Sequence, residues 1–553
     1  MRVLIGAIGL AMGVSAFAAC GSSDPSPTAP SESSQTGAGG QPTSSSNGVG
    51  TGTSAGGANT SDAAPSGGNG GSSDSDAGQS GTGGYQPPTD AAPADGGPPG
   101  SETELPVPPC KKTTPVASSG ELGPALAGAQ PGECLVLADG NYTFPTITKI
   151  GAETAPIVIR AANRGKAVVN SGAIHLDKSA YLVLEGLDVT SPGATTSIYT
   201  GGSNGLLIAF NDSHHCRLTR TRIHPAGAVA ERDWIILIGA ETHHNRIDHN
   251  DLGPQTALAN MVVIDGTGQE EPLMAGQVAQ NNRVDHNYFH DISNTGGNNW
   301  EAMRIGRSWQ GPSKGFNVIE NNLLKGATGD PETISVKSSD NIVRHNTMRA
   351  TAGEICLRHG NRSKVYGNYI LAEGNGGSRG IRVYGADHRI FNNYIAAAAT
   401  GIWVDAGSAT PTDEPGKEHY RVYRAWVFNN TLVGEDIQVG GSKAYPPIDC
   451  RVANNVITGS GSISGGGTNT VNQGNLVGGT NPLTEQDGIF RLLANAQGAL
   501  AIGKAVNTTF YALTDDIDGQ PRSEPDVGAD EQSTAPVVTP GPLTTAAVGP
   551  DSP

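Results

Sequence analysis

Three basic residues stand at comparable places in segments where apolar and polar side chains alternate: Lys337, Arg358 and Arg382. If these segments are β-strands whose apolar side chains face inward, all three basic side chains face outward. Arg304 faces outward by the same alternation and extends the set by one segment. Like charges on adjacent strands, about 4.8 Å apart, repel one another unless an anion offsets them. We therefore expect a column of cations that binds an anionic ligand.

Oxygen-bearing side chains precede this column. Asp330 and Glu332 come shortly before Lys337, and Asn298 and Glu301 lie on the preceding segment. Carboxylate and amide oxygens, without thiolates or a histidine cluster beside them, suit a hard cation, and Ca²⁺ fits best. An acidic loop that only balances the charge of Lys337 is the alternative.

A recurrent unit positions these residues. It consists of an apolar residue, two variable residues, Asn, one variable residue and another apolar residue, with its Asn at Asn250, Asn287, Asn322, Asn346, Asn368, Asn393, Asn430 and Asn455. The shortest spacings between successive Asn residues are about 22 to 25 positions, and longer ones indicate loop insertions. The segments between them are short, alternating and rich in Val and Ile. Each repeat is therefore predicted to be one coil of a β-helix.

The repeated Asn residues are expected to be structural. A tight turn between strands favours a residue that tolerates left-handed backbone angles, and stacked amides on successive coils can form a hydrogen-bonded ladder. Lys337, Arg358 and Arg382 precede the next ladder Asn by nine, ten and eleven residues, which predicts one sheet on three consecutive coils. A helix near residues 120–129 is expected to cap the start. The predicted fold is all-β, a right-handed single-stranded parallel β-helix.

The beginning of the chain has the features of an export signal. Arg2 precedes an apolar run, residues 3–19, that is short for a membrane span. Cys20 follows small residues and resembles the lipidated cysteine of bacterial lipoprotein signals. Simple secretion, with cleavage near Ala18 or Ala19, is the alternative. We therefore expect an extracytoplasmic protein, either an outer-membrane or cell-surface lipoprotein held by its lipid anchor or a secreted protein.

Low-complexity stretches flank the part that can fold. Residues 20–109 consist mainly of Gly, Ser, Thr, Pro, Asp and Ala and cannot bury enough apolar surface to offset the entropy of ordering, so they are predicted to be a disordered linker. A disordered tail is expected at residues 533–553, which leaves residues 110–532 for the β-helix domain. The formal net charge of −17 argues against a general polyanion-binding surface, so no nucleic-acid partner is expected.

Cysteine and histidine positions give weaker signals. Cys110 and Cys134 flank the start of the folded part and can form a disulfide in an oxidising compartment. No CxxC pair indicates a soft-metal site. The paired histidines at 214–215 and 243–244 fall in ordinary coil positions, and no metal is assigned to them.

In combination, these motifs resemble the chondroitinase-B-like alginate lyase family, polysaccharide lyase family six. The resemblance covers most of the part that can fold, with its motifs at residues 127–142, 298–306, 332–338, 357–360 and 380–385. It implies that Asn298, Asp330 and Glu332 bind Ca²⁺. Two departures weaken the metal site: Asp330 stands where the family has Glu, and Asn298 precedes Asn-Trp where Gly or Gly-Trp is common.

The resemblance also implies a mechanism, β-elimination on a uronate polymer. Lys337 would be the Brønsted base that removes the C5 proton, in a neutral form that Arg358 and Ca²⁺ favour. Arg358 would be the acid that assists departure of the C4 oxygen. Ca²⁺ and Arg382 would stabilise the charge that develops on the uronate carboxylate. Further substrate contacts are expected from Arg304, His359, Tyr384 and His388.

Alginate is the expected substrate, and a monomer acting endolytically is the expected form. Chondroitin or dermatan sulfate shares the C5 uronate and is the alternative within the same chemistry. A non-catalytic surface β-helix that binds polysaccharide is an alternative of another class. The presence of both Lys337 and Arg358 argues against it, and loss of activity in Lys337→Ala with retained binding would separate the two.

Overall fold

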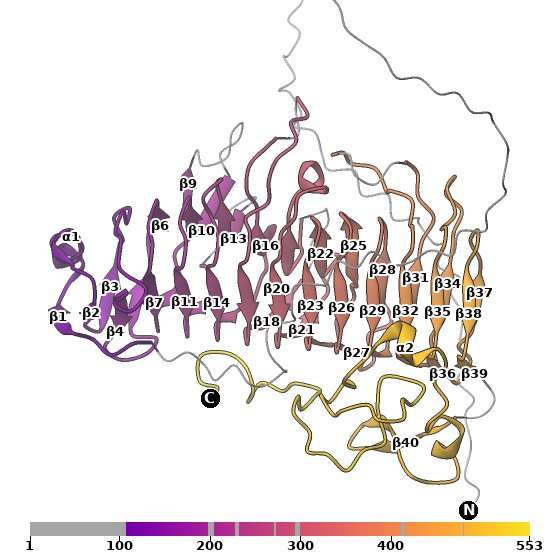
Figure 1. Cartoon of the computed structure of the whole chain (residues 1–553). Helices are drawn as coiled ribbons and strands as arrows, with labels where there is room; N and C mark the ends of the chain where they lie inside the picture. The colour runs from indigo at the N-terminus through magenta and orange to yellow at the C-terminus, as the bar shows by residue number, and fades with distance from the viewer. Residues whose placement is uncertain are drawn as a thin grey trace, which may run out of the picture. The chain divides into compact units, whose positions relative to one another are not determined.

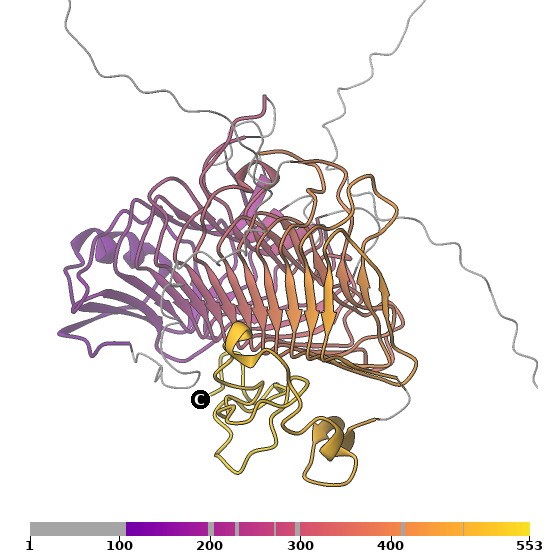
Figure 2. The same ribbon diagram turned by 45° about the vertical axis from the view of Figure 1, so that its right-hand side comes forward.

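The computed structural model describes residues 107–196, 204–226, 232–269, 272–293, 299–410, 415–478 and 481–553. Their strands stack coil upon coil, and each coil passes through three long sheets (Figures 1 and 2). Neighbouring strands within the three sheets pair in parallel, apart from one added antiparallel strand, β9. Because each strand pairs with its counterpart on the next coil, the fold is the predicted right-handed parallel β-helix.

The strands have the following bounds. Sheet A contains, in order, β1 (Lys112–Val116), β2 (Glu133–Leu137), β4 (Ile157–Ala161), β7 (Leu182–Glu185), β11 (Arg217–Thr219), β14 (Arg246–Asp248), β17 (Arg283–Asp285), β20 (Val318–Glu320), β23 (Ile342–Arg344), β26 (Lys364–Tyr366), β29 (Arg389–Phe391), β32 (Trp426–Phe428), β35 (Arg451–Ala453) and β38 (Val471–Gln473). Sheet B contains β3 (Gly140–Tyr142), β5 (Ala167–Val169), β8 (Asp188–Val189), β12 (Arg222–Ile223), β15 (Asp251–Leu252), β18 (Tyr288–Ile292), β21 (Leu323–Ala327), β24 (Thr347–Arg349), β27 (Tyr369–Leu371), β30 (Tyr394–Ala396), β33 (Thr431–Val433), β36 (Val456–Thr458) and β39 (Leu476–Val477). Sheet C contains β6 (Ile174–Asp177), β10 (Asn204–Asn211), β13 (Arg232–Ile238), β16 (Ala259–Ile264), β19 (Met303–Ile305), β22 (Ile334–Lys337), β25 (Ile355–His359), β28 (Arg379–Val383), β31 (Thr400–Val404), β34 (Ile437–Val439) and β37 (Ile463–Gly465), with β9 (Ala194–Thr196) added on β10.

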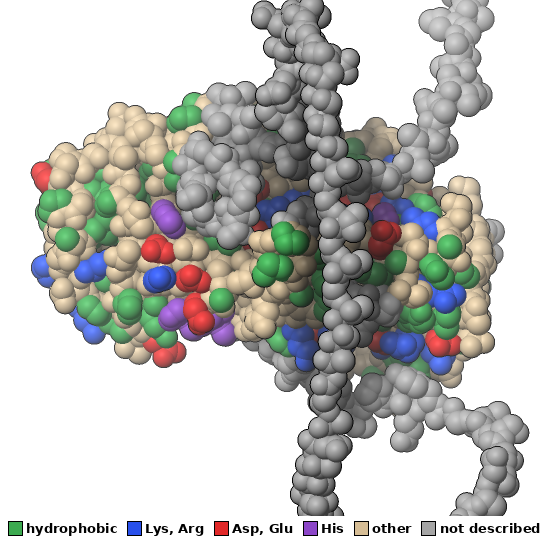
Figure 3. Space-filling model, turned by 90° about the horizontal axis from the view of Figure 1, so that it is seen from above, with side chains coloured by type: hydrophobic (Ala, Val, Ile, Leu, Met, Phe, Trp, Pro, Cys, Tyr) green, Lys and Arg blue, Asp and Glu red, His purple; other side chains and the backbone are tan. Residues whose placement is uncertain are grey.

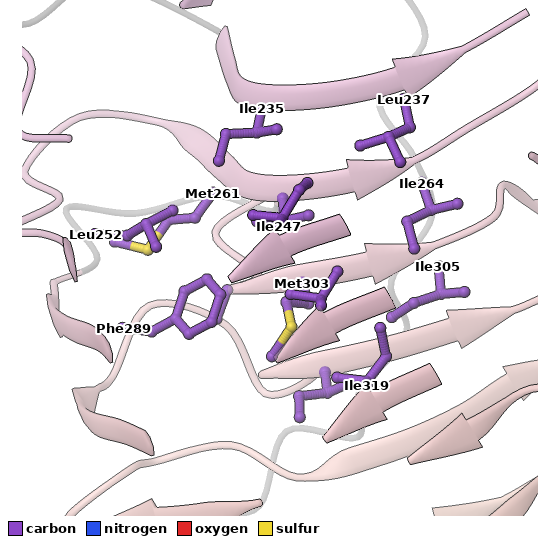
Figure 4. Close-up of a cluster of buried hydrophobic side chains, with 14 of the residues drawn as sticks. Ile235, Leu237, Ile247, Leu252, Met261, Ile264, Phe289, Met303, Ile305 and Ile319 are labelled. Atoms are coloured by element: carbon purple, nitrogen blue, oxygen red, sulfur yellow. The ribbon is translucent and has the colours of Figure 1, made fainter. Parts of the chain in front are cut away.

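Alternation along the strands builds the core. On sheet C, Val336, Leu357 and Val383 pair in register and are fully buried. Aliphatic and aromatic side chains from all three sheets meet inside the coils, as the close-up of residues 235–319 illustrates (Figure 4). Burying each large aliphatic side chain contributes about 1.5–3 kcal/mol, so the stacked interior stabilises the coils and fixes their register.

The predicted asparagine ladder is present and fully buried. The Nδ2 atom of Asn346 donates to Oδ1 of Asn368 at 3.1 Å, and equivalent bonds link each ladder Asn to the next, with Asn475 as a further member. The left-handed residue of the turn is the one before the ladder Asn, for example His345 with φ 53°. The ladder Asn therefore stabilises the turn through its amide hydrogen bonds, and its neighbour adopts the unusual backbone angle.

A second ladder and a row of ion pairs reinforce sheet A. Asn245, Asn282, Asn317 and Asn341 repeat the same amide pattern at another turn, which the sequence analysis did not identify. The buried carboxylate of Asp285 accepts two bonds from Arg246, at 2.9 and 2.6 Å.

One helix and one disulfide complete the start of the domain. Helix α1 (Ser119–Gly128) lies where the capping helix is expected. Cys110 and Cys134 form a disulfide that ties the first residues of the domain to β2, and the free cysteines of the described residues are buried. No helix among the described residues is long and apolar enough to span a membrane. Cys20 and the predicted linker up to residue 106 lie outside the described residues.

The coils end earlier than the sequence indicates. The β-helix stops at β39, and residues 481–532 form a separate segment with an antiparallel pair, β40 (Leu483–Gln486) and β41 (Ile489–Leu492), and short helical turns η2 (Gly498–Leu500) and α2 (Thr508–Tyr511). Ile489 and Ile517 of this segment pack against Tyr394 of β30 on the outer face of sheet B. The segment follows the same side of the stack in both ribbon views (Figures 1 and 2).

Residues 533–553 differ from the expected disordered tail. They run back along the β-helix towards its first coils. The backbone amide of Leu543 donates to Thr347 Oγ1 at 2.9 Å, and that of Gly549 donates to the carbonyl of His286 at 2.8 Å. Near the end, the guanidinium groups of Arg164 and Arg220 donate to the carbonyl of Pro550, at 2.6 and 2.9 Å. The end of the chain is thus bound to coils far from it in sequence.

Candidate active site

The predicted basic residues lie on consecutive strands of sheet C, but in two columns. Arg304 and Arg382 belong to one column, in which Ser335 and Cys356 stand between them. Val336 and Leu357 form the adjacent, buried column, and Lys337 and Arg358 directly follow them in sequence. A register shift after Val336 pairs Lys337 with His359. The single column expected for Lys337, Arg358 and Arg382 is therefore incorrect. The number of residues between strand and ladder Asn varies from coil to coil, so the offsets did not reveal the register.

Each arginine of this site has a carboxylate neighbour. Arg304 donates to Glu301 at 2.6 Å, Arg358 Nε lies 3.5 Å from Glu332, and Arg382 Nη2 donates to Asp405 at 2.7 Å. Seen from above, Lys and Arg side chains lie among Asp and Glu side chains rather than forming a uniform basic surface (Figure 3). Internal carboxylates therefore offset much of the repulsion between these cations, for which the sequence predicted a bound anion.

Lys337 is the exception among these cations. Its side chain is only 8% exposed, yet among the described residues no hydrogen bond or ion pair engages its Nζ atom. Arg358 is the next outward cation along the sheet. Glu332 is buried, but the charges of Lys337 and Arg358 hold the pKa of its carboxyl below the usual range. An amine without a fixed partner, beside a fixed guanidinium, is free to exchange a proton with a ligand.

Three carboxylates gather on the approach to Lys337. Burial, followed by the negative charges of Glu301 and Glu332, raises the pKa of Asp330 to about 7. Glu301 Oε2 is buried without a hydrogen-bond partner, while Ser335 donates to Glu332 at 2.6 Å. Asn298 lies outside the described residues. Carboxylate oxygens, one of them buried without a hydrogen-bond partner, are the type of donor that a hard divalent cation prefers.

A second cluster surrounds Arg382. Asp405, whose side chain is 1% exposed, accepts hydrogen bonds from Arg382, from the Tyr384 hydroxyl and, at 2.7 Å, from Lys443 Nζ. The Arg382 guanidinium also lies 4.4 Å from the ring centroid of Trp403. Tyr384 is fully buried, and burial raises its pKa, so its hydroxyl stays protonated and holds this cluster together.

The predicted histidine contacts divide into two kinds. His359 lies in the site: its Nε2 is 3.3 Å from Arg358 Nη1, and burial followed by the charges of Arg358 and Lys337 lowers its pKa well below the usual value. A neutral His359 accepts from Arg358 and orients it. His388 does not face a substrate, because it is fully buried, its Nδ1 accepts from the amide of Ser363 and its Nε2 donates to the carbonyl of Tyr384. The expected contact through His388 is therefore corrected to a structural role.

The family model described as chondroitinase B matches residues 116–462, more than half of the chain. The chain belongs to the chondroitinase B family. The predicted family resemblance is thereby confirmed, and membership supports the expected class of enzyme, a polysaccharide lyase.

Solved structures similar to this chondroitinase B family member include two lyases. The PL6 family alginate lyase AlyGC is 26% identical with a TM-score of 0.60, over 70% of this chain and 56% of that chain. A mannuronic acid specific polysaccharide family 6 lyase from human gut microbiota is 26% identical with a TM-score of 0.55, over 64% of this chain and 82% of that chain. Pectate lyase L of Dickeya chrysanthemi is 31% identical over 125 residues, which is 19% of this chain and 28% of that protein. The chain thus spans little more than half of AlyGC and under a third of the pectate lyase.

Sequence reasoning missed several residues of the site in this chondroitinase B family member. Asp405 directly follows β31, and the alternation used for Arg382 would have found it one strand further on. Lys443 comes from the loop after β34, and His419 from the segment after residue 414. Neither loop carries a periodic signal, so only the folded chain brings these side chains to Asp405 and Tyr384.

Proposed function

We propose that this protein is a lyase that cleaves alginate by β-elimination, with Lys337 as the base and Arg358 as the proton donor. The observation that carries the proposal is the pairing of a buried, unengaged lysine with a fixed arginine on consecutive strands of one sheet. The similarity to AlyGC and to the mannuronic acid specific lyase favours alginate over other uronate polymers.

In the proposed reaction, neutral Lys337 takes the proton from C5 of the uronate. The C5–H electron pair then forms the C4–C5 double bond as the C4–O bond breaks. Arg358 faces the leaving oxygen and provides its proton. Hydrogen bonds from Arg358 to the carbonyls of Lys417 and Glu418, at 3.2 and 3.4 Å, hold the guanidinium in place before the substrate arrives.

The uronate carboxylate needs positive charge, because removal of the C5 proton increases the negative charge on it. Arg382 and Lys443 supply this charge from the cluster around Asp405. Asp405 fixes both cations and thereby lowers the entropy lost when they bind the carboxylate. Arg304 lies in the same column as Arg382 and provides a contact for the neighbouring sugar.

Asp330, Glu332 and Asn298, together with Glu301, would hold a Ca²⁺ ion at this site. When bound, the ion supplies a positive charge next to the uronate carboxylate. The electrostatic interaction of Asp330 with Glu301 and Glu332 and the unpartnered oxygen of Glu301 support this assignment. Calorimetric titration of chelator-treated protein with Ca²⁺ tests it, and Asp330→Ala should weaken binding at least tenfold, since it removes a direct ligand.

The test of the reaction uses the ultraviolet absorbance of the unsaturated uronate product. Full-length protein should produce a rise on alginate, and Lys337→Ala should slow it by about 10²–10⁴-fold, as expected for loss of a general base. Lys325→Ala is the matched control, because Lys325 is an exposed lysine on sheet B. An unchanged rate in Lys337→Ala would overturn the assignment.

Dermatan sulfate is the second substrate to assay, because the matching family model is that of chondroitinase B. A faster rise on dermatan sulfate than on alginate would change the substrate and leave the reaction as proposed. Binding of either polymer without any product would favour a non-catalytic polysaccharide-binding β-helix.

We also propose that the mature protein is anchored outside the cytoplasm by a lipid on Cys20. The apolar run before Cys20 supports this. Mass analysis of the mature N-terminus tests it, and Cys20→Ser should release the protein from the membrane fraction.

A further inference from the structure

Four histidines meet at one corner of the β-helix, three and four coils before the coil of Lys337. His214 and His215 lie between β10 and β11, and His243 and His244 lie at the same place on the next coil. Their rings form two stacks, with His214 on His243 and His215 on His244, both at 4.8 Å between centroids. Successive rings are nearly perpendicular, and their Nδ1 atoms are 2.9 Å apart in the first pair and 2.8 Å in the second.

This arrangement gathers metal-binding nitrogens in a small volume. One ligand nitrogen from each of His214, His215 and His243 lies within 4.8 Å of the others. Two imidazole nitrogens bound to one tetrahedral ion, with bonds of about 2.0–2.1 Å, are about 3.3 Å apart. The paired Nδ1 atoms are already close to that separation, so small side-chain rotations would complete a three-ligand site.

A neighbouring pair of histidines provides an internal comparison. His249 and His286 are also stacked at 4.8 Å on two consecutive coils. Their Nδ1 atoms, however, each contact a carboxylate, Asp248 and Asp285, at 2.8 Å. Stacking alone therefore does not create a metal site, because the Nδ1 atoms of His249 and His286 already have acidic partners.

We propose that His214, His215 and His243, with His244 beside them, bind a divalent transition-metal ion of the Zn²⁺ class and cross-link two coils. Imidazole nitrogens suit Zn²⁺, Ni²⁺ or Cu²⁺, whereas the carboxylates near Lys337 suit Ca²⁺, so the two sites differ in ligand chemistry. Tyr181 stacks on His215 at 4.8 Å and limits its movement, which keeps the site ordered before the ion binds. This site is independent of the proposed lyase reaction.

The test counts Zn²⁺ bound per chain by equilibrium dialysis of the full-length protein, with excess Ca²⁺ present to saturate carboxylate sites. The double variant His214→Ala/His243→Ala should bind one Zn²⁺ fewer than the unmodified chain, because it removes two ligands at positions of ordinary backbone conformation. His286→Asn is the matched control and should bind the full number, since it removes a stacked histidine whose Nδ1 is engaged by Asp285.

The thermal midpoint and the pH dependence of Zn²⁺ binding provide two further readouts. Zn²⁺ should raise the thermal midpoint of the unmodified chain and of His286→Asn but not that of the double variant. Acidification from pH 7.5 to 5 should release the ion as the imidazoles gain protons. Equal Zn²⁺ counts in the double variant and the unmodified chain, or equal thermal shifts, would overturn the proposal.

Discussion

Replacement of Asn346 by alanine is expected to be among the most destabilising single changes in this domain. Asn346 is fully buried on the coil that carries Lys337. Its Nδ2 donates to the carbonyls of Ile319 and Arg344, at 2.9 and 3.0 Å, as well as to Asn368. Its Oδ1 accepts from the backbone amide and side chain of Asn322, at 3.1 and 2.9 Å.

The magnitude follows from the groups that alanine would leave without partners. The side chain of Asn322 keeps two carbonyl acceptors, and Oδ1 of Asn368 keeps the backbone amide of residue 346. The amide of Asn322 loses its acceptor inside a buried turn, whereas the carbonyl of Ile319, on the paired strand β20, loses only its side-chain donor. An orphaned buried group costs about 1–3 kcal/mol and each other lost hydrogen bond about 0.5–1.5 kcal/mol, so we expect a loss of about 4 kcal/mol in the free energy of unfolding.

Urea unfolding followed by circular dichroism measures this loss. Asn163→Ala is the control, because Asn163 is exposed and makes one side-chain bond, to Asp139. It should cost less than about 0.5 kcal/mol. If Asn346→Ala costs no more than Asn163→Ala, with an unchanged denaturant slope, the ladder does not stabilise the coils and the calculation is refuted.

Three other perturbations test separate parts of the structure. Asp405→Asn should raise KM for the polymer about tenfold, because Arg382 loses the charge that fixes it; an unchanged KM in steady-state assays would contradict this. His286 and Arg246 hold the pKa of Asp285 below its usual range despite burial, so Asp285 stabilises the fold above about pH 4, its unfolded value, and this contribution is lost as pH falls. The difference in unfolding free energy between Asp285→Asn and the unmodified chain should therefore shrink on acidification, as denaturant titrations at several pH values would show. Reducing the disulfide of the first coil should cost about 3 kcal/mol by loss of a crosslink over 24 residues, and an unchanged thermal midpoint under reducing conditions would contradict this.

The repeat was visible in the sequence because the fold requires one residue type at one place in every coil. The short side chain of Asn carries both a donor and an acceptor that match the next coil, so its recurrence predicts the solenoid. The register of the strands on sheet C was harder to predict from the sequence. A difference of one residue in the path from strand to turn moves a side chain to another column, and this is why Arg382 pairs with Cys356 instead of Arg358.

Long-range contacts explain the remaining differences. The composition of residues 533–553 is typical of disorder, yet Arg164 and Arg220 bind this segment through its backbone carbonyls. Every residue has a backbone carbonyl, so no pattern of side chains predicts hydrogen bonds of this kind. His388 was misassigned for a related reason, since a histidine bound by two backbone groups is indistinguishable in sequence from one that faces a ligand.

The returning C-terminal segment changes how the solenoid unfolds. In a simple repeat protein each coil interacts only with its neighbours, so stability is nearly a one-dimensional sum and end coils fray independently. Here residues near 543 bind the coil of β24, and those near 550 bind the coils of β4 and β11. Fraying at the first coils must therefore release a segment anchored on the middle coils, which couples coils that are not adjacent and makes melting of the domain more cooperative than that of an unbraced solenoid.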